Sequence, residues 1–269
     1  MSVKTTKKNN RNGDSMATLD PSNRVKLDNK VTALYHMVIG GLGETDFSSA
    51  SFLVVNRFPE KARNMMRRSQ MGIKTGAKEA KNPIQCFKDS LYRFPEEVET
   101  PIGNTIFGIP AVAIKKAAVR AFKAMDGKFM SDAKGQFFCY GKLDEEETTE
   151  LVPVVAPAIT RLNYKERLLA EVMDVSEDEM LDLLKVEHQY GACLREDDVR
   201  VSRGVADIRY RASFPEWRIP FTMGVTPPDI VSREVLCEAI DSSGRSVGLC
   251  ENRPEKSGDR WGQFELLTS

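Results

Sequence analysis

The sequence has little of what most catalytic and metal sites are built from. It contains only two histidines, His36 and His188, and its five cysteines include no CxxC pair. An odd number of unpaired cysteines argues against a disulfide framework and a cysteine zinc site, and it favours a reducing cytoplasm. The HExxH, GxxxxGK[ST] and GxSxG motifs are also missing. We therefore expect no metal, no cofactor and no standard catalytic constellation.

Long apolar runs are missing as well. No stretch approaches the roughly 20 residues that a membrane helix needs, and the first residues, MSVKTTKKNN, lack the apolar core of a secretory signal. The 269 residues are 41% hydrophobic and 29% charged, which is typical of a soluble globular protein with one large domain or two small ones. These features predict a cytoplasmic protein that does not bind a membrane.

The net charge is zero, but charges of opposite sign occupy different parts of the chain. Residues 1–30 hold seven Lys or Arg against three Asp, and residues 57–81 hold eight basic side chains against two acidic ones. Residues 144–198 reverse the sign, with sixteen acidic side chains against five basic. Segregated blocks favour a basic face and an acidic face, although each block alone is also compatible with ordinary solvated surface.

The order of predicted elements indicates an α+β fold. Residues 1–28 lack periodicity and are predicted to form a disordered basic arm. Residues 30–39 read as a core strand, and residues 111–125 read as a helix that follows the short strand 103–109. A core of residues 29–156 and 191–269 is interrupted by an acidic helical insertion, 157–190, which contains the capping box Ser176–Glu179.

The last third of the chain is predicted to be a compact unit that holds a nucleic-acid backbone. Strands 206–214 and 217–225 are expected to form a β-hairpin around Pro215 and Glu216. A helix over 228–240, a strand over 245–249 and a closing strand over 261–267 complete it.

The first candidate site is the glycine loop, residues 248–262, within this unit. Glycine permits positive φ, so that backbone N–H groups can face an anion while nearby cations neutralise phosphates. The alternative is a long hairpin with a glycine turn. The candidate residues are Gly248, Arg253, Lys256, Gly258, Arg260 and Gly262.

Three further basic groups are candidates for nucleic-acid contact, each with an ordinary solvated face as its alternative. The first lies in the segment 195–211, the second on the helix 111–125, whose N-terminal N–H groups suit anions, and the third in the segment 59–76. These residues are Arg203, Arg209 and Arg211; Lys115, Lys116 and Arg120; and Arg63, Arg67, Arg68 and Lys74. His36 is a weak catalytic candidate, because a histidine in an apolar strand is more often packed or hydrogen-bonded.

Two of these segments resemble a known family. Residues 108–120 (GIPAVAIKKAAVR) resemble the strand-to-helix step of the RAMP superfamily, and residues 247–264 resemble its glycine-rich loop. The superfamily includes backbone subunits of CRISPR effector complexes. The resemblance implies a ferredoxin-like or RRM-like antiparallel sheet with packed helices, and a protein that polymerises along RNA.

The chain resembles a group of bacteriophage proteins more closely. Four blocks carry this resemblance in order: residues 82–92, 107–119, 203–217 (RGVADIRYRASFPEW) and 247–264. Cys250 and Asn252 depart from the group's Gly and Trp, and Asn82 and Gln263 from its Asp and Arg. We expect Cys250 and Asn252 to make the glycine loop less tight.

These observations predict a phage-encoded, non-enzymatic protein that binds single-stranded RNA or DNA in the cytoplasm of the bacterial host and oligomerises along it. One alternative is a metal-independent RAMP-like endoribonuclease that uses His36. Another is an interaction protein whose acidic lobe docks on a host or phage partner.

Overall fold

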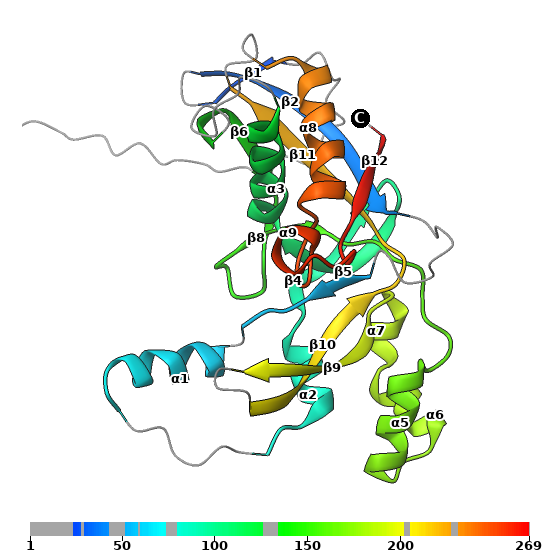
Figure 1. Ribbon diagram of the computed structural model, residues 1–269. Helices are drawn as coiled ribbons and strands as arrows, with labels where there is room; N and C mark the ends of the chain where they lie inside the picture. The colour runs from blue at the N-terminus through cyan, green and yellow to red at the C-terminus, as the bar shows by residue number, and fades with distance from the viewer. Residues whose placement is uncertain are drawn as a thin grey trace, which may run out of the picture.

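The structure is a computed structural model that describes residues 24–27, 30–42, 52–58, 60–73, 80–125, 134–201, 205–226 and 231–268. These residues form a mixed α+β protein whose strands pair antiparallel in three sheets (Figure 1). The predicted α+β class is therefore correct. Among the helices described, none has the length and apolar character that a membrane span requires.

The largest sheet is built around one long strand, in the upper part of Figure 1. This strand, β2, pairs with β11 along one edge and with β1 and β12 at the two ends of its other edge, while β6 pairs with β11. The strands are β1 (Arg24–Leu27), β2 (Lys30–Gly41), β6 (Phe137–Tyr140), β11 (Arg218–Val225) and β12 (Phe264–Thr268). The disordered arm predicted over 1–28 is thus wrong at β1, and residues 1–23 lie outside the described residues.

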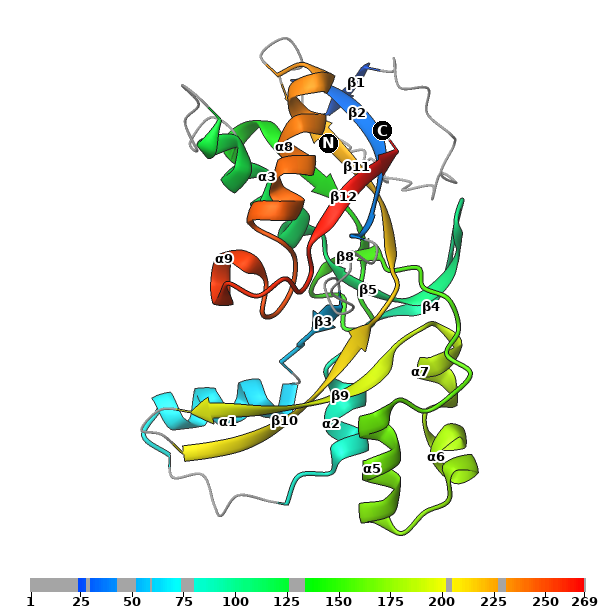
Figure 2. The same ribbon diagram turned by 45° about the vertical axis from the view of Figure 1, so that its right-hand side comes forward.

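Two helices lie side by side over one face of this sheet (Figures 1 and 2). They are α3 (Ala111–Ala124) and α8 (Arg233–Ser246). Their buried residues, among them Ile114 and Ile240, belong to one apolar core with Met37, Ile39 and Met223 from the sheet. Apolar spacing near 3.6 on the helices and near 2 on the strands explains why both elements bury one face here.

Two smaller sheets continue the core below the first. One has the order β3-β10-β9, with β3 (Leu53–Val55), β9 (Cys193–Val201) and β10 (Val205–Phe214). The other has the order β4-β5-β8-β7, with β4 (Tyr92–Thr100), β5 (Gly103–Pro110), β7 (Lys142–Leu143) and β8 (Glu150–Pro153). Helix α1 (Glu60–Gln70) extends away from these sheets, and α2 (Pro83–Asp89) packs on β10 (Figure 2).

The predicted hairpin of residues 206–225 is wrong. Strand β10 pairs with β9 and β3, whereas β11 pairs with β2 and β6, so the two strands belong to different sheets. Residues 215–217 are a crossover rather than a reversal. Trp217 is buried there, and Arg218 and Val155 exchange backbone hydrogen bonds of 2.8 Å, which hold the chain as it passes between sheets.

The segment that follows also differs from prediction. Helix α8 begins at Arg233, after the Ser232 cap, and it continues to Ser246, so the strand expected over 245–249 does not form. Gly244 explains the longer helix: a side chain there would collide with the Phe264 carbonyl, so its absence lets α8 pack directly on β12. The loop predicted after it contains a single turn of helix, α9 (Pro254–Ser257).

The acidic stretch forms three short helices, α5 (Tyr164–Met173), α6 (Glu177–Leu183) and α7 (Lys185–Gln189). The predicted capping box at Ser176 and Glu179 is present. A buried carboxylate anchors these helices to β9: Glu166 accepts hydrogen bonds from the Leu194 amide at 2.7 Å and lies 3.0 Å from His188 Nε2. The helices therefore form a lobe fixed to the core.

Gly262 in the glycine loop occupies a position where the backbone is tightly constrained. Its φ is +67°, and a Cβ there would overlap the Leu249 carbonyl. We expect Gly262→Ala to lower the free energy of unfolding by about 3 kcal/mol or more, because strain and overlap add. Gly258 has φ +78° with open space around it, so Gly258→Ala should cost only about 1 kcal/mol. Equal losses in urea unfolding would contradict this account.

Candidate functional site

A cavity of about 530 Å³ opens where the glycine loop, β3, β10 and α3 meet. Its wall combines apolar side chains, including Val55, Val112 and Leu249, with a group of cations. Six residues predicted from the sequence line it, and they come from three separate segments: Lys116, Arg120, Arg209, Gly248, Arg253 and Lys256. The structure therefore gathers much of the predicted basic set in one place.

The first turn of α3 borders this cavity. Val112 and Ala113 line it, the N-cap residue Pro110 makes no side-chain cap hydrogen bond, and the first turn carries no acidic residue. The first N–H groups of a helix have no partner within the helix, and the helix dipole favours an anion beside them. The predicted helix N-terminus thus coincides with the cationic cavity.

Glycine-loop amides, by contrast, do not face the cavity as predicted. The Gly248 amide donates to Ser243, the Gly258 amide to Pro254 and the Gly262 amide to Phe52. All three glycines do have positive φ, so the expected conformational need for glycine is correct. The loop instead presents its side chains, while its backbone is used to hold the loop on α8 and β3.

Two departures from the phage-group pattern fall at strained positions. Cys250 has φ +59° and Asn252 has φ +54°, the left-handed region that glycine occupies most readily. The loop keeps its fold at Cys250 despite the side chain, which lines the cavity. Burial raises the pKa of the Cys250 thiol to about 12, so that it is neutral at physiological pH and leaves the charge of the cavity unchanged.

Two glutamates organise the cations. Glu251, which lines the cavity, lies 2.9 Å from Arg211, 3.5 Å from Lys256 and 3.9 Å from Arg209. Glu255 pairs with Arg120 of α3 and lies 3.3 Å from Arg253. The five cations that line the cavity therefore face two carboxylates, a formal charge of +3, while the buried Arg211 lies among the charges of Glu251 and Asp197.

Arg211 is not available as a surface contact, and this prediction is wrong. Its side chain is only 3% exposed. Desolvation lowers its pKa, while the charges of Glu251 and Asp197 raise it. Arg209 and Arg211 do share one face of β10, and Glu251 of the loop lies near both, but Arg211 is buried beside it whereas Arg209 is 43% exposed.

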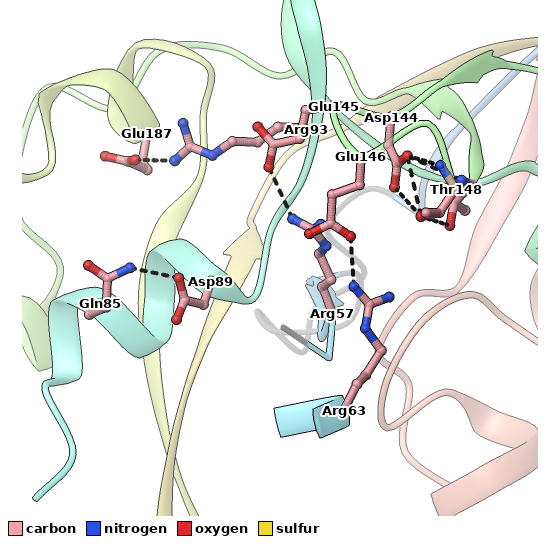
Figure 3. A network of polar contacts seen from close by, with 11 residues as sticks. Arg57, Arg63, Gln85, Asp89, Arg93, Asp144, Glu145, Glu146, Thr148 and Glu187 are labelled. Atoms are coloured by element: carbon pink, nitrogen blue, oxygen red, sulfur yellow. Dashed lines mark hydrogen bonds and ion pairs between the residues drawn. The ribbon is translucent and has the colours of Figure 1, made fainter. Parts of the chain in front are cut away.

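Other predicted contacts lie outside the cavity wall. Lys115 packs over the Phe138 ring at 4.8 Å, Arg260 is exposed, and Lys74 and Arg203 lie outside the described residues. On α1, Arg63 forms an ion pair of 2.7 Å with Glu146, which also binds Arg57 (Figure 3), while Arg67 and Arg68 are exposed. The acidic turn after β7 therefore neutralises part of the basic segment.

His36 lies on an exposed position of β2 and not inside the core. Its Nδ1 is 3.0 Å from the Thr222 hydroxyl on β11. It does not line the cavity, so the described site offers the endoribonuclease alternative no catalytic histidine.

Sequence reasoning missed the apolar side of the cavity. Phe58 and Tyr92 both line it, and Phe58 is 57% exposed. Phe58 follows β3 and Tyr92 begins β4, so only the tertiary fold brings them beside the cations. An aromatic side chain close to a basic stretch was the available signal for Phe58.

Comparison with protein-family models and with curated proteins found no match to this chain.

The buried pair of Arg211 and Glu251 makes a stability prediction. Glu251→Gln leaves Arg211 buried without its contacting carboxylate, and it should lower the free energy of unfolding by about 3 kcal/mol. The double variant Arg211→Met/Glu251→Gln should recover most of this loss, because the isolated buried charge is removed. Glu255→Gln, at a half-exposed pair, is the control and should change stability by less than about 1 kcal/mol in urea unfolding. If the double variant lost at least as much stability as Glu251→Gln alone, the buried-pair interpretation would be refuted.

Proposed function

We propose that this protein is a non-enzymatic nucleic-acid-binding protein that holds the backbone of single-stranded RNA or DNA in the cationic cavity. The observation that carries the proposal is the convergence of five cations, Lys116, Arg120, Arg209, Arg253 and Lys256, on one cavity that the first turn of α3 also borders. The proposal extends to oligomerisation along the strand.

Phosphate is the ligand chemistry that fits these groups best. Arginine side chains bind phosphate oxygens in paired hydrogen bonds, and N–H groups of a helix start add donors that need no side chain. An excess of three positive charges remains after both glutamates are counted, so an anion gains Coulomb energy on entering. Release of condensed counterions from the strand would add to this gain.

A single strand fits better than a duplex. Phe58 and Tyr92 lie in the same cavity as the cations, and aromatic rings stack on exposed bases. In a duplex the bases are paired and stacked inside, whereas a single strand offers base and phosphate together. The volume of about 530 Å³ leaves room for a nucleotide rather than a phosphate alone.

The two segments that carry the RAMP resemblance both contribute to this cavity. The β5–α3 step supplies Lys116 and Arg120, and the glycine loop supplies Arg253 and Lys256. This juxtaposition supports our proposal of a RAMP-like, ferredoxin-like arrangement and a phage-encoded protein that acts in the bacterial host cytoplasm. Helices α3 and α8 packed on one face of an antiparallel sheet are consistent with it.

Removal of one cavity cation should weaken binding in a salt-dependent way. Arg120→Ala should reduce affinity for a single-stranded oligonucleotide by about tenfold at low salt, and it should lower the slope of log affinity against log salt by about 0.7. Lys123→Ala is the matched control, because Lys123 is an exposed cation of the same helix outside the cavity wall. Gel-shift or anisotropy titration at two salt concentrations measures both effects. Absence of binding by the native protein, or binding without salt dependence, would refute the proposed function.

Glu255 should oppose binding, because its carboxylate occupies Arg120 and Arg253 in the free protein. Glu255→Gln keeps the shape and removes the charge, and we expect it to tighten oligonucleotide binding by about three- to tenfold. Glu238→Gln, an exposed position on α8, is the control. Weaker binding by Glu255→Gln would mean that this glutamate positions the arginines for the ligand.

A further inference from the structure

We propose that copies of this chain join head to tail, with α1 of one copy docking on the acidic lobe of the next. Two exposed surfaces carry the proposal. The α1 surface consists of Met65, Met66, Met71, Ile73, Arg67 and Arg68. The lobe surface consists of Tyr164, Leu168, Val172, Leu183 and Val186 with Glu177, Asp178 and Asp182.

The α1 surface exposes four large apolar side chains beside its two arginines. Met71 is 73% exposed, and Met65, Met66 and Ile73 are each more than two-fifths exposed. The helix extends away from the three sheets in both views (Figures 1 and 2). Exposed clustered methionines are typical of surfaces that bind a partner, because the flexible thioether adapts to an irregular apolar face.

The lobe surface shows the same property with the opposite charge. Tyr164, Leu168 and Val172 recur at intervals of four along α5, so they form one stripe on the side opposite the buried Leu169 and Ala170. Val172 is 83% exposed. Helix α6 adds exposed Leu183 among Glu177, Asp178 and Asp182.

The occupant of each surface follows from charge and geometry. Apolar residues with arginines on one surface complement apolar residues with carboxylates on the other. The two surfaces lie on opposite sides of the lower half of the molecule in both views, so one copy cannot satisfy both within itself (Figures 1 and 2). A contact between two different patches is heterologous, and it repeats from copy to copy into an open chain or a closed ring.

This inference concerns the assembly that the proposed function invokes, and its test contains no nucleic acid. An interface of one short helix is small, so the native protein is studied by sedimentation velocity at roughly 100 μM, above the micromolar dissociation constants expected for such contacts. The α1 variant is Met66→Asp/Met71→Asp, and the lobe variant is Val172→Asp/Leu183→Asp. Leu143→Asp, at a half-exposed position of β7, is the matched control.

We expect the native protein and the control to form a concentration-dependent ladder of species that shortens as salt rises. Each variant alone should sediment as a monomer. An equimolar mixture of the two variants should form one-to-one dimers and nothing longer, because each variant keeps one intact half of the contact.

Three results would overturn the proposal: a monomeric native protein, a lobe variant that assembles normally, or a mixture that stays monomeric. Oligonucleotide titration of the monomeric variants separates this failure from that of the proposed function, since the cavity lies outside both altered surfaces. Monomers that still bind an oligonucleotide with native salt dependence would leave the cavity proposal intact whatever the assembly result.

Discussion

The Glu251 carboxylate is the contact on which the arrangement of the cavity depends. Its main chain is fixed to β3, since the Glu251 amide donates to the Val54 carbonyl at 3.0 Å, and its side chain meets Arg211 of β10 at 2.9 Å. Strands β3 and β10 are themselves paired, so Glu251 fixes the loop to two neighbouring strands of the same small sheet. Because Arg211 is buried, this ion pair is shielded from solvent, and the loss of either partner would leave a charge in a nonpolar environment. The same carboxylate also holds Lys256 and Arg209 at the cavity edge, so that one buried interaction sets the positions of two surface cations.

Backbone conformation is the second constraint on the shape of the loop. Gly248 and Gly262 lie at positive φ with protein atoms where a side chain would stand, so both the dihedral angle and the close approach require glycine. Cys250 and Asn252 adopt the same region without glycine, at a cost in local strain that the surrounding contacts must offset. The inward-directed amides follow from this geometry. They leave side chains as the groups that the loop presents.

Local signals in the sequence predicted individual elements well and their partners poorly. Helical periodicity and the capping box gave α3 and the α5–α6 boundary, because both depend on residues within a few positions of one another. The hairpin at Pro215 failed because a turn signal does not reveal which sheet receives the next strand; the bridge between Arg218 and Val155 and the burial of Trp217 decide this, and both are long-range. The strand expected over 245–249 failed in the same way, because the sequence does not reveal that Gly244 permits α8 to pack closely on β12. The candidate cations were identified as a set, but their division into cavity lining, buried pair and outlying surface required the fold.

The distribution of charge in the structure refines the meaning of a neutral sequence. Acidic residues are not confined to one remote lobe: Glu146 is paired with Arg63 and Arg57, and Glu251 and Glu255 are paired with cavity cations (Figure 3). A cation that is held by a carboxylate is fixed in place before a ligand arrives, which lowers the entropy lost on binding. It also binds the ligand less strongly, because the carboxylate has to be displaced or tolerated. The cations of the cavity outnumber its glutamates, so the cavity keeps an ordered set of cations and a net attraction for anions. On α1, by contrast, the ion pair between Glu146 and Arg63 reduces the excess of positive charge.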